Sequence, residues 1–206
     1  DGNINRTDAG TPQTDPGLQS RVDGLFRGLN PNYSMTLLDM SPGQPLRYAE
    51  HRPSAQYQPG SVGKLVVLAA FFTGLQQVYP DSFDQRIALL KTKQITSGEW
   101  AIHDHHTVPV YDLETGKQVK RKVTNSDVFS LFEWVDHMVS VSNNGAASVV
   151  WREALLMHIF KDRYPALTFE ESEAYFKSQP KSELSEFAIN TVNQPLRDLG
   201  ITEDEW

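Results

Sequence analysis

Ser61 and Lys64 lie three residues apart at the start of a strongly apolar stretch. Residues 58–60, Gln-Pro-Gly, are typical of a turn, and Ser61 follows where the N-cap of a helix would lie. From Val62 to Leu75 the sequence is apolar on nearly every helical face, which predicts a buried core helix that is too short to span a membrane. The i, i+3 spacing places the serine hydroxyl and the lysine amine on one face of that helix.

This pairing suits nucleophilic catalysis. A lysine amine in apolar surroundings loses its proton more readily, because desolvation disfavours the charged form. A neutral amine at position 64 can accept the proton of Ser61 and make its oxygen a nucleophile, and backbone N–H groups at the helix start suit a developing oxyanion. A second Ser-x-x-Lys, from Ser178 to Lys181, contains a proline and precedes a polar segment, so we assign the chemistry to the first copy.

The composition indicates a globular chain with a real core. Of its 206 residues 39% are hydrophobic, and the formal net charge of −7 argues against a nucleic-acid partner. The absence of cysteine excludes disulfides and thiolate zinc sites. Residues 1–17 are rich in Gly, Asn, Thr, Asp and Pro, which predicts a flexible leader like the start of a processed secreted chain.

Apolar periodicity and turn residues predict a helix-rich order of elements. The expected helices are 18–29, 62–75, 83–90, 126–139, 146–160 and 184–199, and the expected strands are 33–40, 46–50, 108–111 and 119–123. Ser82 or Asp81 is expected to cap the third helix, Ser126 or Asn125 the fourth, and Gly200 to end the last. The basic run 120–122 is expected to be a solvated strand edge.

His103, Asp104, His105 and His106 invite a metal interpretation. Adjacent residues point in different directions, and no partner ligand recurs at helical spacing as it does in a His-Glu-x-x-His helix. We therefore expect a surface loop here and no metal site.

Ser142, Asn143 and Asn144 interrupt two apolar helical stretches. The simplest interpretation is that the hydroxyl and amide cap the next helix. Together with Ser61-Val62-Gly63-Lys64, however, this Ser-x-Asn sequence resembles the serine penicillin-recognising enzymes, the class A β-lactamases and penicillin-binding DD-peptidases, whose motifs are Ser-x-x-Lys, Ser-Asp-Asn and Lys-Thr-Gly. Asn143 replaces the usual middle aspartate, a change that we expect to be tolerated.

The resemblance implies an α/β (α+β) fold with an all-helical subdomain and an antiparallel sheet subdomain. Residues 18–60 would supply the first helix and strands of the sheet subdomain, and residues 61–202 the helical subdomain, with insertions at 95–123 and 162–182. It also implies a role for each residue. Ser61 would be the acylated nucleophile, Lys64 its proton acceptor and Ser142 the proton donor to the leaving nitrogen. Asn144 would bind the substrate amide and help to hold Lys64, and no cofactor or metal is implied.

Two features of the family are not found. Glu114-Thr115-Gly116-Lys117 is the wrong order for a Lys-Thr-Gly and precedes the second motif, and Glu203 and Glu205 lie too near the end to serve as a class A deacylating glutamate. We therefore expect only the N-terminal portion of the fold in this sequence, because an isolated two-stranded hairpin is marginal. A C-terminal segment, either of the same chain or a second chain of the same protein, would complete the fold.

The predicted function is β-lactamase-type hydrolysis through an acyl-enzyme, in a secreted or periplasmic protein whose substrates carry an acyl-D-Ala-D-Ala-like amide. Three alternatives remain open. They are a D-Ala-D-Ala carboxypeptidase or transpeptidase, a non-catalytic binding module of the same fold, and a glutaminase of a related fold.

Overall fold

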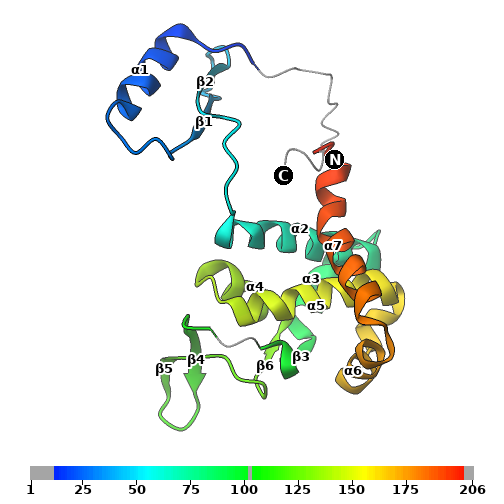
Figure 1. Cartoon of the computed structure of the whole chain (residues 1–206). Coiled ribbons are helices and arrows are strands. Elements are labelled where there is room, and N and C mark those ends of the chain that lie inside the picture. Colours follow the sequence, from blue (N-terminus) through cyan, green and yellow to red (C-terminus); the bar gives the residue numbers. More distant parts are fainter. Residues whose placement is uncertain (1–11, 102–103, 202–206) are drawn as a thin grey trace. The chain divides into compact units, whose positions relative to one another are not determined.

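Helices and small antiparallel sheets make up this computed structural model, which describes residues 12–101 and 104–201 (Figure 1). Helices account for 55% of the chain, so the coarse prediction of a mixed α and β protein is confirmed. The chain divides into two units, Asp1–Gln58 and Pro59–Trp206, each of which is described by itself.

In the N-terminal unit a helix covers a two-stranded sheet. The elements are α1 (Pro16–Phe26), β1 (Met35–Asp39) and β2 (Arg47–His51), and the two strands are antiparallel. Leu18 and Val22 of α1 form a small core with Ala49 of β2. The three predicted elements are confirmed, with β1 shorter than predicted and β2 shifted by one residue. The helix begins earlier than predicted, because Asp15 caps it by accepting the backbone N–H of Leu18 at 2.7 Å, so the predicted leader ends before Asp15 and its residues 1–11 lie outside the described residues.

The second unit is organised around α2 (Lys64–Val78), which follows the 3-10 turn η1 (Gly60–Gly63). Its buried positions include Val67, Phe71 and Leu75, and α5 (Asn144–Phe160) and α7 (Lys181–Asp198) pack against it (Figure 1). The prediction of an apolar core helix is confirmed.

The predicted N-cap role of Ser61 is wrong. The chain enters the 3-10 turn at Gly60, whose φ of 54° suits glycine, so Ser61 already lies inside η1. The helical segment is also longer than predicted, because it continues to Val78. By length and composition alone, Gly60–Val78 is long and apolar enough to cross a membrane, so the prediction that this run is too short is wrong; core helices also pass this test.

The remaining helices surround α2 and α5. They are α3 (Phe83–Thr92), α4 (Leu131–Ser140), η3 (Lys161–Ala166) and α6 (Phe169–Ser178). Ser82 caps α3 as predicted, by accepting the N–H of Gln85. The predicted helix at 126–139 begins instead at Leu131, because Ser130 and Glu133 form a capping box there. The predicted polar insertion at 162–182 contains α6, which begins with its own capping box of Thr168 and Glu171.

Two small sheets complete this unit. β3 (Gln94–Thr96) pairs with β6 (Val128–Ser130), β4 (Val108–Asp112) pairs with β5 (Lys117–Arg121), and the 3-10 turn η2 (Gly98–Trp100) follows β3. The predicted hairpin is therefore confirmed. The expected solvated edge at 120–122 is confirmed, because Lys120 and Lys122 are exposed and the Arg121 side chain is 41% exposed. The guanidinium of Arg121 also donates two hydrogen bonds, at 2.6 and 2.8 Å, to the carboxylate of Asp127, which is only 7% exposed.

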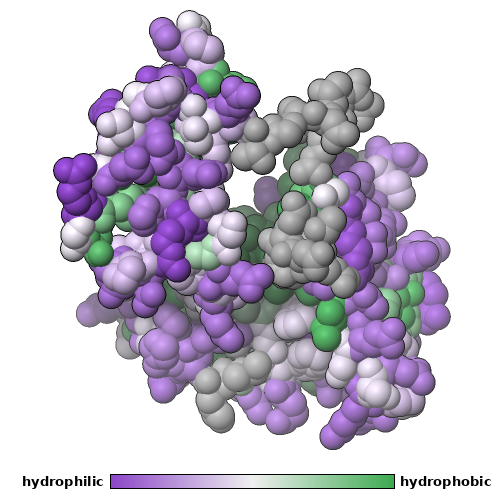
Figure 2. Space-filling model, turned by 45° about the horizontal axis from the view of Figure 1, so that its top comes forward, coloured by the Kyte–Doolittle hydropathy of each residue, from purple (hydrophilic) through white to green (hydrophobic). Residues whose placement is uncertain are grey.

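Hydrophilic residues cover most of the face shown in Figure 2, with hydrophobic residues gathered in small areas. Several apolar side chains next to Ser61 are well exposed, among them Val62 at 65% and Leu65 at 59%. The start of α2 is thus an open surface, whereas one face of its middle and end, with Val67, Phe71 and Leu75, is core.

Candidate active site

Lys64 joins the two predicted motifs. Its Nζ lies 3.1 Å from Oγ of Ser61, 3.3 Å from Oγ of Ser142 and 2.6 Å from Oδ1 of Asn144. Oγ of Ser142 lies 2.9 Å from Oγ of Ser61. The structure therefore brings together all four predicted site residues, although about 80 positions separate the two motifs.

In the segment between α4 and α5, Asn143 caps the next helix, which leaves the side chains of Ser142 and Asn144 free to face Lys64. Asn143 is 1% exposed, and its Oδ1 accepts the N–H of Ala146 at 2.7 Å as the N-cap of α5. Ser142 has φ of 57°, an uncommon conformation for a non-glycine residue. The interpretation that Ser142 and Asn144 cap the next helix is therefore wrong, because both side chains contact Lys64 instead.

Asp104, which lies outside this loop in the sequence, is hydrogen-bonded to it. Its side chain is 4% exposed, and its Oδ2 accepts the backbone N–H of Asn144 at 2.6 Å. Next to it, the carbonyl oxygen of His106 accepts a hydrogen bond of 3.0 Å from Nδ2 of Asn143. Segment 104–106 thus contacts both asparagines of the motif.

The pKa of the Asp104 carboxyl lies well below its usual range. Burial alone would raise its pKa, but the backbone N–H of Asn144 and the ring of His106 outweigh burial and lower the pKa. Sequence reasoning missed this residue, because its partner is 40 positions away and no local pattern links them. The expected surface loop is wrong for Asp104 and right for His105, whose side chain is 85% exposed; His103 lies outside the described residues.

Segment 104–106 also contains a group of possible metal ligands within the part of the chain that the structure describes. One ligand atom each from Asp104, His105 and His106 lie within 4.8 Å of one another. The argument that adjacent side chains must diverge here is therefore wrong.

Two hollows border Lys64. One, of about 300 Å³, is lined by Ser61 and Ser142 with an apolar rim, Val62, Leu65, Met138 and Val139. The other, of about 510 Å³, lies beside Asn144 and is lined mainly by apolar groups, including Trp100 and Trp151. A small molecule can therefore approach the Ser61 hydroxyl from solvent.

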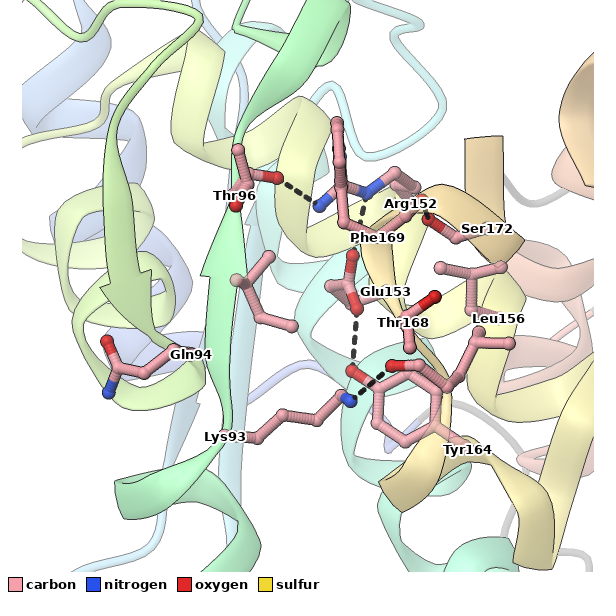
Figure 3. A pocket seen from close by; sticks show the side chains of 12 residues that line it. Lys93, Gln94, Thr96, Arg152, Glu153, Leu156, Tyr164, Thr168, Phe169 and Ser172 are labelled. Atoms are coloured by element: carbon pink, nitrogen blue, oxygen red, sulfur yellow. Dashed lines mark hydrogen bonds and ion pairs between the residues drawn. The ribbon is translucent and has the colours of Figure 1, made fainter. Parts of the chain in front are cut away.

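A second group of charged side chains lies deeper in the same unit, around a cavity of about 50 Å³ (Figure 3). Arg152 and Glu153 of α5 form an ion pair at 2.6 Å, and the hydroxyl of Tyr164 donates to Glu153, also at 2.6 Å. Burial, followed by the adjacent Glu153, raises the pKa of Tyr164. Arg152 also donates to the carbonyl oxygens of Thr96 and Ser97, both at 2.8 Å. These contacts fasten α5 to β3 and η3, a role that sequence reasoning missed although an Arg-Glu pair inside an apolar helix was a usable signal.

Comparisons with family models, with curated proteins and with solved structures found no match for this chain. The resemblance to penicillin-recognising enzymes therefore rests on the sequence of this chain alone, and the geometry around Lys64 is the main structural observation that bears on function.

Proposed function

We propose that this protein is a serine hydrolase that forms an acyl-enzyme at Ser61 and hydrolyses the amide bond of β-lactams. The observation that carries the proposal is the position of the Lys64 amine, within hydrogen-bonding distance of both serine hydroxyls and of Asn144. An amine next to a serine hydroxyl, oriented by a third group, is the arrangement that activates a serine nucleophile.

The hydrogen-bonding capacity of the amine supports this role. A neutral amine has two N–H donors and one lone pair. In the reactive state, Lys64 donates one N–H to Asn144 Oδ1 and the other to Ser142 Oγ, and its lone pair accepts the proton of Ser61. Ser142 donates its own hydroxyl proton to Ser61 Oγ, at 2.9 Å. Asn144 orients the amine, because an amide oxygen can only accept.

Acylation then proceeds by a balanced proton relay. Ser61 Oγ attacks the lactam carbonyl carbon while its proton moves to Lys64 Nζ. As the carbon–nitrogen bond breaks, Ser142 gives its proton to the leaving nitrogen and takes one from Lys64. The product is an ester at Ser61, and attack by water on that ester releases the ring-opened acid and restores the serine. The two transfers that involve Lys64 are between atoms 3.1 and 3.3 Å apart, and the third is between Ser142 and the bound substrate.

The proposal includes a further segment that covers the apolar rim beside Ser61. Val62, Leu65 and Val139 are at least half exposed there. In the enzymes that the motifs resemble, a strand carrying Lys-Thr-Gly forms this wall of the site, and we propose that an equivalent strand from a C-terminal segment does so here, in a secreted or periplasmic protein.

Intact-mass spectrometry with and without a penicillin tests the nucleophile. We expect an adduct with the full mass of the penicillin, or consumption of the penicillin without an adduct if hydrolysis of the ester is fast. Both should disappear in Ser61→Ala. The matched control is Ser178→Ala, which removes the serine of the other Ser-x-x-Lys and should leave both unchanged.

The outcomes separate the candidate functions. Rapid consumption of penicillin indicates a β-lactamase, and a long-lived adduct indicates a DD-peptidase instead. The proposal is wrong if the original protein neither forms an adduct nor consumes penicillin, and a non-catalytic binding module then explains the motifs better. It is also wrong if Ser61→Ala still forms the adduct or consumes penicillin.

A further inference from the structure

The side chains of Asp104, His105 and His106 converge although the residues are consecutive. Nδ1 of His106 lies 2.9 Å from Oδ1 of Asp104, and Nδ1 of His105 lies 3.3 Å from the same oxygen. The two imidazole rings lie side by side, with centroids 4.1 Å apart. We propose that these three residues bind a divalent transition-metal ion of the zinc type.

The spacing of the ligand atoms carries this proposal. Zinc binds nitrogen and oxygen ligands at about 2.0–2.1 Å in a tetrahedron, so neighbouring ligand atoms lie about 3.4 Å apart. The separations of 2.9 and 3.3 Å from the shared Oδ1 are close to that edge length. The ligand atoms of His105 and His106 lie within 4.8 Å of each other, so side-chain movements that close this third edge would complete the site.

The identity of the donors selects the class of ion. Two imidazole nitrogens and one carboxylate oxygen suit zinc and its neighbours, whereas magnesium and calcium need more oxygen ligands. Three protein ligands leave a fourth position for water. The side chain of His105, 85% exposed, gives the ion a path from solvent.

The ion would also fasten the second motif. The other carboxylate oxygen of Asp104 accepts the N–H of Asn144, and the carbonyl of His106 accepts Nδ2 of Asn143. An ion that fixes Asp104 and His106 therefore fixes two contacts of the loop that carries Ser142. The binding of the ion does not depend on the proposed hydrolase activity, and its test is separate.

Calorimetric titration of the chelator-treated protein with zinc chloride tests the site. We expect one ion per chain and no binding of magnesium at the same concentration. His105→Ala should weaken zinc binding by about 10-fold or more through the loss of one ligand, and this exposed side chain can be removed without disturbing the core. The matched control is His51→Ala, which removes a histidine of the other unit and should leave zinc binding unchanged.

Amide NMR provides a second measurement that depends on the coupling to the loop. Zinc should shift the backbone amide resonance of Asn144 in the original protein and not in His105→Ala. Absence of zinc binding, or binding of equal strength in His105→Ala, would overturn the site, the latter by showing adventitious surface binding. Zinc binding without a shift of the Asn144 amide resonance would overturn the link to the loop.

Discussion

Helix α5 carries two groups of polar side chains with opposite surroundings. At its start, Asn144 is exposed and completes the group around Lys64, which opens to solvent at Ser61. In its middle, Arg152 and Glu153 are 1% and 2% exposed. Their interactions are made with a tyrosine hydroxyl and backbone carbonyls.

The difference separates a structural group from the group that we propose to be reactive. A buried ion pair needs nearly complete hydrogen bonding, because removing it from water is costly, and the contacts of Arg152 and Glu153 meet that need. The group around Lys64 has reachable hydroxyls and an amine that can exchange protons with them. Buried charged residues therefore indicate a contribution to the stability of α5. Solvent access and hydrogen-bonded hydroxyl and amine groups indicate the candidate site of chemistry.

Lys64→Ala should have the largest effect and act on chemistry alone. Removing the proton acceptor should lower the rate of acylation at Ser61 by about 10²- to 10⁴-fold, without unfolding the protein, because the amine lies at the edge of the core. Acylation is measured by mass spectrometry over time and folding by thermal unfolding. Lys181→Ala, in the second Ser-x-x-Lys, is the matched control. A rate in Lys64→Ala equal to that of the original protein would remove Lys64 from its assigned role.

Glu153→Ala should have the opposite profile. It leaves Arg152 buried without its carboxylate partner, a change that costs about 3–5 kcal/mol of unfolding free energy. Denaturant unfolding measures the loss. The exposed Glu170→Ala serves as the control and should change stability little. If Glu153→Ala were as stable as the control, the buried group would not be the support of α5 that we describe.

Asp104→Asn tests a buried carboxylate that contacts the loop of the open group. It weakens the contact to the N–H of Asn144 and should slow acylation by about 10-fold, the equivalent of one charged hydrogen bond. Because Asp104 acts by positioning, we expect the rate at saturating substrate and the apparent affinity to change together while the nucleophile is still acylated. A complete loss of the adduct, with folding intact, would argue instead for a direct chemical role.

The same contrast explains what the sequence could predict. The helix containing Lys64 and the motif at 142–144 are local patterns, so both were found, and their meeting followed from the resemblance. Asp104 and Arg152 act on partners 40 and 55 positions away, and only the fold reveals such contacts. The N-caps predicted at Ser61 and at Ser142 and Asn144 are wrong, and Asn143 caps α5 instead. Capping depends on where the helical backbone begins, and residue types alone leave that open by a few positions.

Asp39→Asn should have the smallest effect, because its ion pair lies at the surface of the N-terminal unit. Hydrogen bonds from Ser41 and then Arg47 lower the pKa of Asp39 from 3.8 to about 2. Since this pKa is lower in the folded state, the stabilisation is fully present above pH 3.8 and disappears as the pH falls through about 2. Unfolding of Asp39→Asn and of the original protein, compared from pH 6 down to pH 2, should show a small difference that shrinks with acid, whereas the exposed control Asp162→Asn should show none. A difference that stays constant across this range would mean that the charge of Asp39 does not stabilise the unit.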